Sequence, residues 1–409
     1  MNPLKLVSDA NQKRLHDHRH SPIGTVSLLT VFSKLFNKHS IITLPESANY
    51  NGQDTLNLLL YAATSSTNSL ESASNDLKTK NPDIKIPSAD TLFNYIKENN
   101  IEDILSAFRK MNHEILKTMK IEKGVHDLAI DFHDIPYYGD KNTPGIRGIK
   151  PKNGSSWGKS FCTLDIVGEV HLTLNVIDIN GLSKNYSILI ESLVKRVKGM
   201  GVKIGTVYLD KEFFNIDVIS KLDELKVDFI IAAKSNQVIN QKLKVHQEKF
   251  GNTSTIFKYH FQQGGPSFNI VAIDDSTAKK YILFATNKET ESVEKFEKII
   301  PEEYRKRWNI ETGYRVKNDF KIRTCTKSPV ARVLFFVIQC VMYNVLNMLK
   351  SVLKITAYEL KSSIAQDIKK AVRYGLKSLN VIPVKILLED LTWFNEERNR
   401  VLHTRLTQI

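Results

Sequence analysis

Hydrophobic positions along the first third of the chain recur every three to four residues, which is the period of an amphipathic helix. This pattern predicts helices over residues 25–36, 54–63 and 101–119, and a further helix that opens after Ser88. Asp54 and Ser88 stand where the apolar periodicity begins, and their side chains suit the capping position of a helix. The region up to residue 122 is therefore expected to be helical.

The pattern changes after Gly124, where short apolar runs alternate with helical stretches. A Gly-, Pro- and Lys-rich loop is expected over residues 138–159, and Gly168-Glu169 is a hairpin signal. The expected strands are 128–135, 161–167, 170–179, 203–209 and 227–233, with helices over 183–200 and 215–226. Three antiparallel strands followed by alternating helices and strands are typical of a ribonuclease-H-like α/β domain.

The alternation stops at residue 237. Strand-like runs at 255–261, 268–273 and 281–286 predict a β-rich insertion over residues 237–300. Pro301 suits the first position of a new helix, and Glu302 and Glu303 suit its positive N-terminal end.

A long apolar segment over residues 330–353 has the length of a membrane span. It contains Arg332, Gln339 and Lys350, however, so we interpret it as a buried core helix and expect no membrane association.

These elements divide the chain into regions. We expect a helical N-terminal region over 1–122, a ribonuclease-H-like mixed sheet from 123–236 and 301–350 interrupted by the 237–300 insertion, and a helical C-terminal region over 351–409. The two short helices on either side of the Ser/Asn/Lys-rich stretch 64–87 suit a DNA-binding module or a helical cap on the next domain.

Composition adds a possible partner. The chain carries 58 Lys and Arg against 44 Asp and Glu, a net charge of +14. A basic surface attracts polyanions, so nucleic acid and anionic membrane are the leading partners, although a soluble basic protein could share this charge. Cys162, Cys325 and Cys340 are far apart and lack zinc-ligand spacing, which disfavours a disulfide framework or a zinc finger. The N-terminal residues lack a secretory pattern, so we expect a cytoplasmic protein.

Two aspartates stand in or after predicted strands. Asp131 lies within the apolar strand LAIDFHDI, on the same face as His133. A buried carboxylate there is costly unless a cation compensates it or it lies at an edge. Asp210 ends the strand TVYLD, and ligands collect at the carboxyl ends of strands in α/β sheets, although an aspartate there can also cap the next helix.

A third acid lies in the helical stretch YRKRWNIETGYRVKNDF. Projection at about 100° per residue gathers one acid, two arginines, a tyrosine and an asparagine in an arc of about 80°. These residues are Tyr304, Arg307, Glu311, Arg315 and Asn318. A surface ion-pair stripe would look similar, but apolar residues on the other sides predict a largely buried helix: Trp308, Ile310, Tyr314 and Phe320.

Three converging carboxylates suit a pair of divalent cations, which activate an attacking oxygen and stabilise a leaving oxygen in phosphoryl transfer. Oxygen ligands favour Mg²⁺, with Mn²⁺ as a substitute. The neighbouring arginines and tyrosine could hold DNA phosphates. Lys141, Arg147, Lys150, Lys152 and Lys159, with Trp157, could likewise contact DNA from the 138–159 loop, or be a solvated charge run.

The arrangement Tyr304-x2-Arg307-x3-Glu311 resembles the Y-R-E-K signature of prokaryotic insertion-sequence transposases with a DDE triad. Asp131 and Asp210 are similar to the first two acids of that family, and the apolar helix with Tyr343-Asn344 is similar to the one that follows its signature. The resemblance covers about residues 128–349. Asn318 departs from it, because the signature has Lys there; Arg315 or Lys321 could supply the missing charge.

The resemblance implies a DNA transposase of the prokaryotic cytoplasm, acting on the nucleoid as a homodimer in a synaptic complex with double-stranded DNA. Asp131, Asp210 and Glu311 would be its catalytic metal ligands, and Tyr304, Arg307, Arg315, Asn318 and Lys321 its DNA contacts. Cleavage at the element end would free a 3′-hydroxyl that attacks target DNA. The residues alone imply only metal-assisted phosphoryl transfer, so a nuclease of this fold without strand transfer and an inactive DNA-binding derivative stay open.

Overall fold

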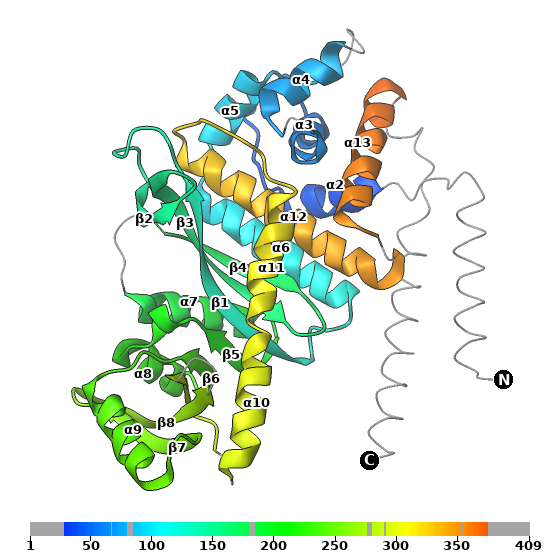
Figure 1. Cartoon of the computed structure of the whole chain (residues 1–409). Helices are drawn as coiled ribbons and strands as arrows, with labels where there is room; N and C mark the ends of the chain where they lie inside the picture. The colour runs from blue at the N-terminus through cyan, green and yellow to red at the C-terminus, as the bar shows by residue number, and fades with distance from the viewer. Residues whose placement is uncertain are drawn as a thin grey trace, which may run out of the picture. The chain divides into compact units, whose positions relative to one another are not determined.

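The structure is a computed structural model, and it describes residues 28–66, 68–79, 85–179, 185–275, 280–289, 292–353 and 355–374. The chain forms two compact units. One is helical and combines residues from both ends of the chain, Met1–Lys120 and Lys317–Ile409; the other, Ile121–Val316, contains the sheet. Each unit is described by itself (Figure 1).

The sheet unit is built on one mixed sheet of nine strands. Their order is β2-β3-β1-β5-β6-β9-β8-β7, with β4 paired to β3. β1 runs antiparallel to β3 and parallel to β5, and β5 is parallel to β6. The strands are β1 Val125–Pro136, β2 Arg147–Lys152, β3 Ser155–Val167, β4 Leu172–Ile179, β5 Lys203–Leu209, β6 Asp228–Ala232, β7 Thr255–Phe261, β8 Gly264–Asp275 and β9 Lys280–Thr286.

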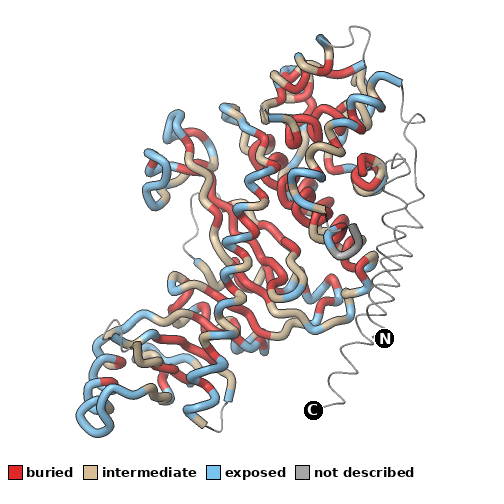
Figure 2. Tube along the Cα trace, turned by 45° about the vertical axis from the view of Figure 1, so that its right-hand side comes forward, coloured by how far each residue is buried: buried red, intermediate tan, exposed pale blue. Residues whose placement is uncertain are grey.

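Helices flank this sheet, and burial is concentrated along its central strands (Figure 2). The helices are α7 Tyr186–Gly199, α8 Ile216–Glu224, α9 Gln237–Phe250, α10 Val293–Arg305 and α11 Trp308–Asn318, with the short 3-10 helix η1 at Lys211–Phe213. The mixed α/β fold is thus confirmed. The hairpin at Gly168 is confirmed too: its φ of +108° suits a glycine, and β3 pairs with β4 antiparallel across it.

Two segments differ from the sequence interpretation. The expected loop over 138–159 contains β2, which forms a hairpin with β3. The segment 237–300 supplies α9 as well as three strands, and β9 pairs antiparallel with β6. These strands therefore continue the main sheet. Apolar periodicity locates a strand but does not reveal which strand it pairs with.

The prediction that Pro301 begins a helix is wrong. α10 begins at Val293, where the Ser292 side chain accepts a hydrogen bond from the Lys295 backbone N–H. Pro301 lies inside α10, and the buried residues of this helix, Phe296 and Ile300, precede the proline. The apolar spacing of these two residues, rather than the proline, marks the helix.

The helical unit contains seven described helices: α2 Leu28–His39, α3 Gly52–Thr64, α4 Leu70–Thr79, α5 Ala89–Lys97, α6 Ile101–Thr118, α12 Pro329–Leu353 and α13 Ala357–Tyr374. Ser88 caps α5 as predicted, but the predicted cap Asp54 is wrong. Asn51 caps α3, and Asp54 completes a capping box from the third helical position. Residues 25–27 and 375–409 lie outside the described residues.

Helix α12 belongs to the core of the helical unit. It packs against α6, and the amides of Asn344 and Asn112 share a buried hydrogen bond of 2.8 Å. Among the described residues it is the one helix long and apolar enough to cross a membrane, yet 89% of its most apolar stretch is buried within the protein. That burial is what a core helix requires.

Candidate active site

Asp131 lies on β1, between β3 and β5, opposite Thr163 of β3. Its Oδ1 accepts the Phe132 backbone N–H at 2.9 Å, and only 19% of its side chain is exposed. Burial raises the pKa of Asp131 to about 7, against the opposing effect of the Arg307 guanidinium, and the charges of Asp210 and Glu311 raise it further. Asp131 therefore lies within range of the charges of both other acids.

Asp210 stands beside Asp131 in the sheet because β1 and β5 are parallel neighbours. Their pairing ends at Ile130 and Leu209, so the two aspartates follow at the same level of adjacent strands. Asp210 also caps η1, and its Oδ1 accepts the Lys211 backbone N–H at 2.7 Å. Asp210 is thus both the residue at the carboxyl end of β5 and the cap of η1.

Glu311 is in the first turn of α11, with its side chain 46% exposed. Its Oε1 accepts a hydrogen bond from Arg307 Nη2 at 2.7 Å, while Arg307 Nη1 lies 3.8 Å from Asp131 Oδ2. The buried guanidinium also lies over the Tyr304 ring, 5.4 Å from its centroid. Arg307 is thus a cation between two of the three carboxylates.

Two tyrosines connect α10 and α11 to the strands that carry the aspartates. The Tyr304 hydroxyl donates to the Leu209 carbonyl at 3.1 Å, directly before Asp210. The Tyr314 hydroxyl donates to the Asp131 carbonyl at 3.3 Å and lies 2.7 Å from Thr163 Oγ1. The Tyr314 ring stacks on His133 at 4.3 Å, which accounts for the burial of that histidine.

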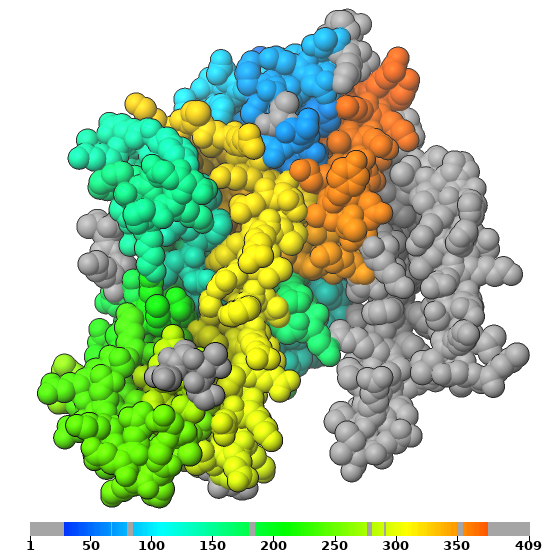
Figure 3. All heavy atoms as spheres, in the orientation of Figure 1, coloured from blue at the N-terminus to red at the C-terminus, as the bar shows by residue number. Residues whose placement is uncertain are grey.

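The structure does not keep the predicted stripe on a single helical face. α10 ends at Arg305 and α11 starts at Trp308. Between them the backbone N–H groups of Lys306 and Arg307 bond three residues back, as in a 3-10 turn, so a constant 100° projection does not apply. Trp308 is 63% exposed, against the expectation of a buried side chain, whereas Ile310, Tyr314 and Phe320 are buried as expected. Figure 3 shows α10 and α11, in yellow, at the surface of the face in view.

The predicted DNA contacts differ in exposure. Arg315 and Asn318 are exposed, Lys321 is partly buried, and Tyr304 and Arg307 have the partners described above. Lys317, one position before the asparagine that replaces the signature lysine, is buried with its ammonium 4.9 Å from the centre of the Tyr343 ring. Lys317 therefore does not present its charge to solvent.

The acids suit a hard divalent cation by their chemistry, because carboxylate oxygens are the ligands that Mg²⁺ and Mn²⁺ prefer. Asp131 supports this fit: it is a buried carboxylate whose nearest cation stands 3.8 Å from Oδ2. Across the described part of the chain, three or more His, Cys, Asp or Glu side chains do not meet in a group that could hold a metal ion. As they stand, the three carboxylates do not form a metal-binding group, and the Arg307 guanidinium lies between Asp131 and Glu311.

Comparison with known proteins places this site in a family. The structure is similar to one titled as the cryo-EM structure of a piggyBac transposase synaptic complex with hairpin DNA, with a TM-score of 0.54 and 14% identity over 90% of this chain and 80% of that chain. At this identity the likeness concerns the fold. Curated protein sequences give no match. The family model of the transposase DDE domain matches residues 128–345, which is more than half of the chain and includes Asp131, Asp210 and Glu311. This chain therefore belongs to the transposases with a DDE domain.

Proposed function

We propose that this transposase cuts DNA at the ends of a mobile element and joins the freed 3′-hydroxyls to target DNA, with Asp131, Asp210 and Glu311 as ligands of Mg²⁺ or Mn²⁺. The observation that carries the proposal is geometric: Asp131 and Asp210 follow the last paired residues of adjacent parallel strands, and Arg307 bonds to Glu311 and lies 3.8 Å from Asp131. Bound cations would activate the attacking oxygen and stabilise the negative charge on the leaving oxygen of a phosphodiester.

The protein's own residues would prepare this site for DNA. In the DNA-free protein Arg307 bonds to Glu311 and lies 3.8 Å from Asp131, so its one positive charge offsets only part of theirs. A phosphate offers the guanidinium an alternative bidentate partner. Transfer of Arg307 to DNA would leave the carboxylates available to cations, so binding and metal loading would be coupled.

The remaining DNA contacts follow from exposure. Arg315 and Asn318 can meet phosphates as they stand, and Lys321 adds charge nearby in sequence. Before it could donate to a phosphate, the Tyr304 hydroxyl would have to break its hydrogen bond to the Leu209 carbonyl. The β2–β3 hairpin adds exposed Lys150 and Lys152, and the loop before it adds exposed Lys141. Lys150 pairs with Glu212, two residues after Asp210, so this basic hairpin borders the site.

We further propose that the enzyme is of the prokaryotic insertion-sequence type with a Y-R-E-K signature. Tyr304, Arg307 and Glu311 have the required spacing. In this proposal the helical region within residues 1–122 binds DNA, and the enzyme acts as a homodimer. The similar solved structure is of a synaptic complex, which supports assembly on DNA.

The test uses purified protein, Mg²⁺ and the DNA that flanks its own gene. Asp131→Asn, Asp210→Asn and Glu311→Gln should each abolish cleavage and leave DNA binding nearly intact, because metal ligands stabilise the transition state while phosphate contacts supply affinity. Asp134→Asn is the matched control on β1, since Asp134 accepts a hydrogen bond from Ser160 and faces away from Asp131. Near-normal cleavage by any of the three variants removes that residue from the triad.

Strand transfer is tested separately. A DNA end already cleaved to a 3′-hydroxyl should be joined to a target plasmid in Mg²⁺. Cleavage without joined products would identify a nuclease of the same fold. Binding without nicking, in Mn²⁺ as well, would identify an inactive derivative.

A further inference from the structure

Glu311 lies between two contacts that hold α11 and the turn before it to β1. Before it, Lys306 Nζ lies 2.7 Å from Asp127 Oδ2; after it, the Tyr314 hydroxyl donates to the Asp131 carbonyl. Both partners are on the strand that carries the first catalytic aspartate. The position of Glu311 relative to Asp131 is therefore set through one strand and one helical segment.

The lengths of the two segments match. Tyr314 is eight residues after Lys306, about 12–16 Å for a rise between about 1.5 Å per residue in an α-helix and about 2.0 Å in a 3-10 turn. Four residues separate Asp127 from Asp131, about 13 Å at a strand rise of about 3.3 Å per residue. The segment from Lys306 to Tyr314 can thus run along β1 and make both contacts at once. Two contacts at different points of β1 restrict movement of α11 along the strand as well as its tilt.

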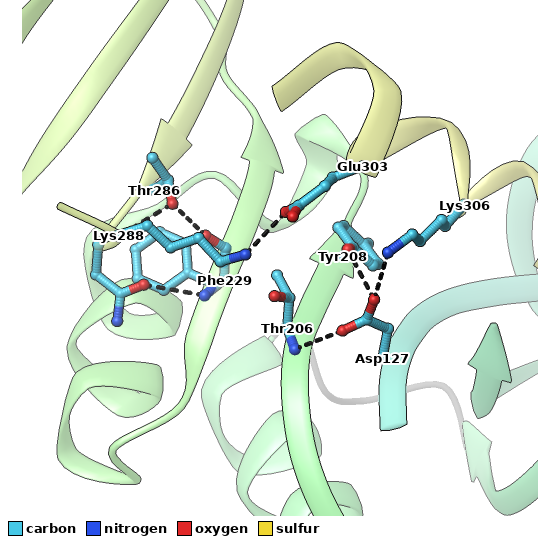
Figure 4. Close-up of polar contacts among 9 residues, drawn as sticks. Asp127, Thr206, Tyr208, Phe229, Thr286, Lys288, Glu303 and Lys306 are labelled. Atoms are coloured by element: carbon cyan, nitrogen blue, oxygen red, sulfur yellow. Dashed lines mark hydrogen bonds and ion pairs between the residues drawn. The ribbon is translucent and has the colours of Figure 1, made fainter. Parts of the chain in front are cut away.

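The first contact is part of a polar network (Figure 4). Asp127 also accepts the Thr206 backbone N–H at 2.9 Å and the Tyr208 hydroxyl at 3.2 Å. Although burial alone would raise the pKa of Asp127, the hydrogen bonds from Lys306 and Thr206 hold it below its ordinary value. Lys288 and Glu303, at 2.8 Å, tie α10 to the segment after β9.

The second contact, between Tyr314 and Asp131, involves one of the proposed catalytic residues directly. Tyr314 is buried and can donate only one proton, so donation to the Asp131 carbonyl leaves its oxygen to accept from Thr163. The chain Thr163–Tyr314–Asp131 is directional. The apolar packing of Ile310 and Tyr314 against Ala129 and Tyr208 is not, so packing alone would permit small displacements of the helix.

We infer that Tyr314 is a positioning residue, whose hydroxyl holds the helix that carries Glu311 to the strand that carries Asp131, so that the two acids can share a cation. This inference rests on the proposed triad. A merely structural hydroxyl would contribute to stability alone, whereas a positioning hydroxyl also controls rate and cation binding.

The experiment compares two tyrosine hydroxyls. Tyr314→Phe keeps the ring on His133 and removes only the hydroxyl. The matched control is Tyr259→Phe in the same unit: Tyr259 is also buried, and its hydroxyl accepts from Asn236 at 2.8 Å, on the β7 side of the sheet. Both variants should lower the thermal unfolding midpoint, Tyr314→Phe by more, since its hydroxyl makes two hydrogen bonds and the Tyr259 hydroxyl accepts one from Asn236.

Only Tyr314→Phe should slow cleavage, by about ten- to a hundredfold as expected for a displaced catalytic group, with DNA affinity unchanged. It should also weaken Mn²⁺ binding to the protein–DNA complex, measured by electron paramagnetic resonance, while Tyr259→Phe should not. Thr163→Val removes the donor to Tyr314 and should give a smaller change in the same direction; it serves in place of Tyr314→Phe if that variant does not fold.

Equal cleavage rates and equal Mn²⁺ affinities for the Tyr314 and Tyr259 variants would overturn the inference. Failure of the triad itself would look different. In that case Asp131→Asn would still cleave, whatever the Tyr314 variant does.

Discussion

Asp131 is a buried carboxylate that the metal-free protein holds at a cost, and its removal should stabilise the fold. A carboxyl whose pKa rises from 3.8 to about 7 on folding binds more protons in the folded than in the unfolded state between those two values. Stability should therefore fall as the pH rises from about 4 to about 7, and then level off, by about 4 kcal/mol at most. Asp131→Asn keeps the Oδ1 acceptor for Phe132 and removes this loss.

The assay is urea unfolding in EDTA at pH 5 and pH 8. We expect Asp131→Asn to be more stable than the wild type at pH 8, by no more than about 4 kcal/mol, with a smaller gain at pH 5. Saturating Mg²⁺ should reduce the stability difference between the variant and the wild type at pH 8. The wild type keeps all three acids and is therefore stabilised more by bound Mg²⁺.

Asp178 provides the contrast. It is also buried, and burial raises its pKa, but Lys159 Nζ lies 2.5 Å from its carboxylate and is itself buried. Asp178→Asn removes a negative charge paired with that buried ammonium and should cost about 3–5 kcal/mol at pH 8. If Asp131→Asn destabilises the protein at pH 8 as Asp178→Asn does, the reasoning about Asp131 is refuted.

Three further predictions concern the helix that carries Glu311. Arg307→Ala should weaken binding to cleaved DNA ends and lower the salt slope of log K by about 1, with Arg307→Lys restoring only part; unchanged affinity, slope and cleavage would make Arg307 a structural ion-pair residue. Asn318→Lys should tighten DNA binding at low salt in a filter-binding assay, and no change would assign the charge to Arg315 or Lys321. Lys306→Met should slow cleavage but cost no more than about 1 kcal/mol in urea unfolding, because the pair with Asp127 is partly exposed; an unaltered rate would argue against the first of the two contacts with β1.

The sequence by itself determined the elements whose signals are local. Apolar alternation located β1, β5 and β6, and helical periodicity located α6, α7 and α12, because side-chain direction repeats within each element. The same local information selected Asp131 as a costly acid in a strand and Asp210 as an acid at a strand end. The spacing of Tyr304, Arg307 and Glu311 selected the third acid through family resemblance.

Local signals failed where a distant partner decides the outcome. Pro301 looked like a helix start, yet the burial of Phe296 and Ile300 against the sheet extends α10 back to Ser292. The three strands within 237–300 were located by the sequence, but only the pairing of β9 with β6 shows that they extend the main sheet. A helical projection that assumed an unbroken helix predicted a buried Trp308, but this side chain is exposed.

The tertiary structure alone decided how the site is held together. The Arg307 guanidinium stands between Glu311, four residues away, and Asp131, on a strand far earlier in the chain. The Tyr314 hydroxyl reaches the backbone of that same strand. Such contacts leave no periodic trace in the sequence, because they depend on where separate elements meet rather than on the repeat within any one of them.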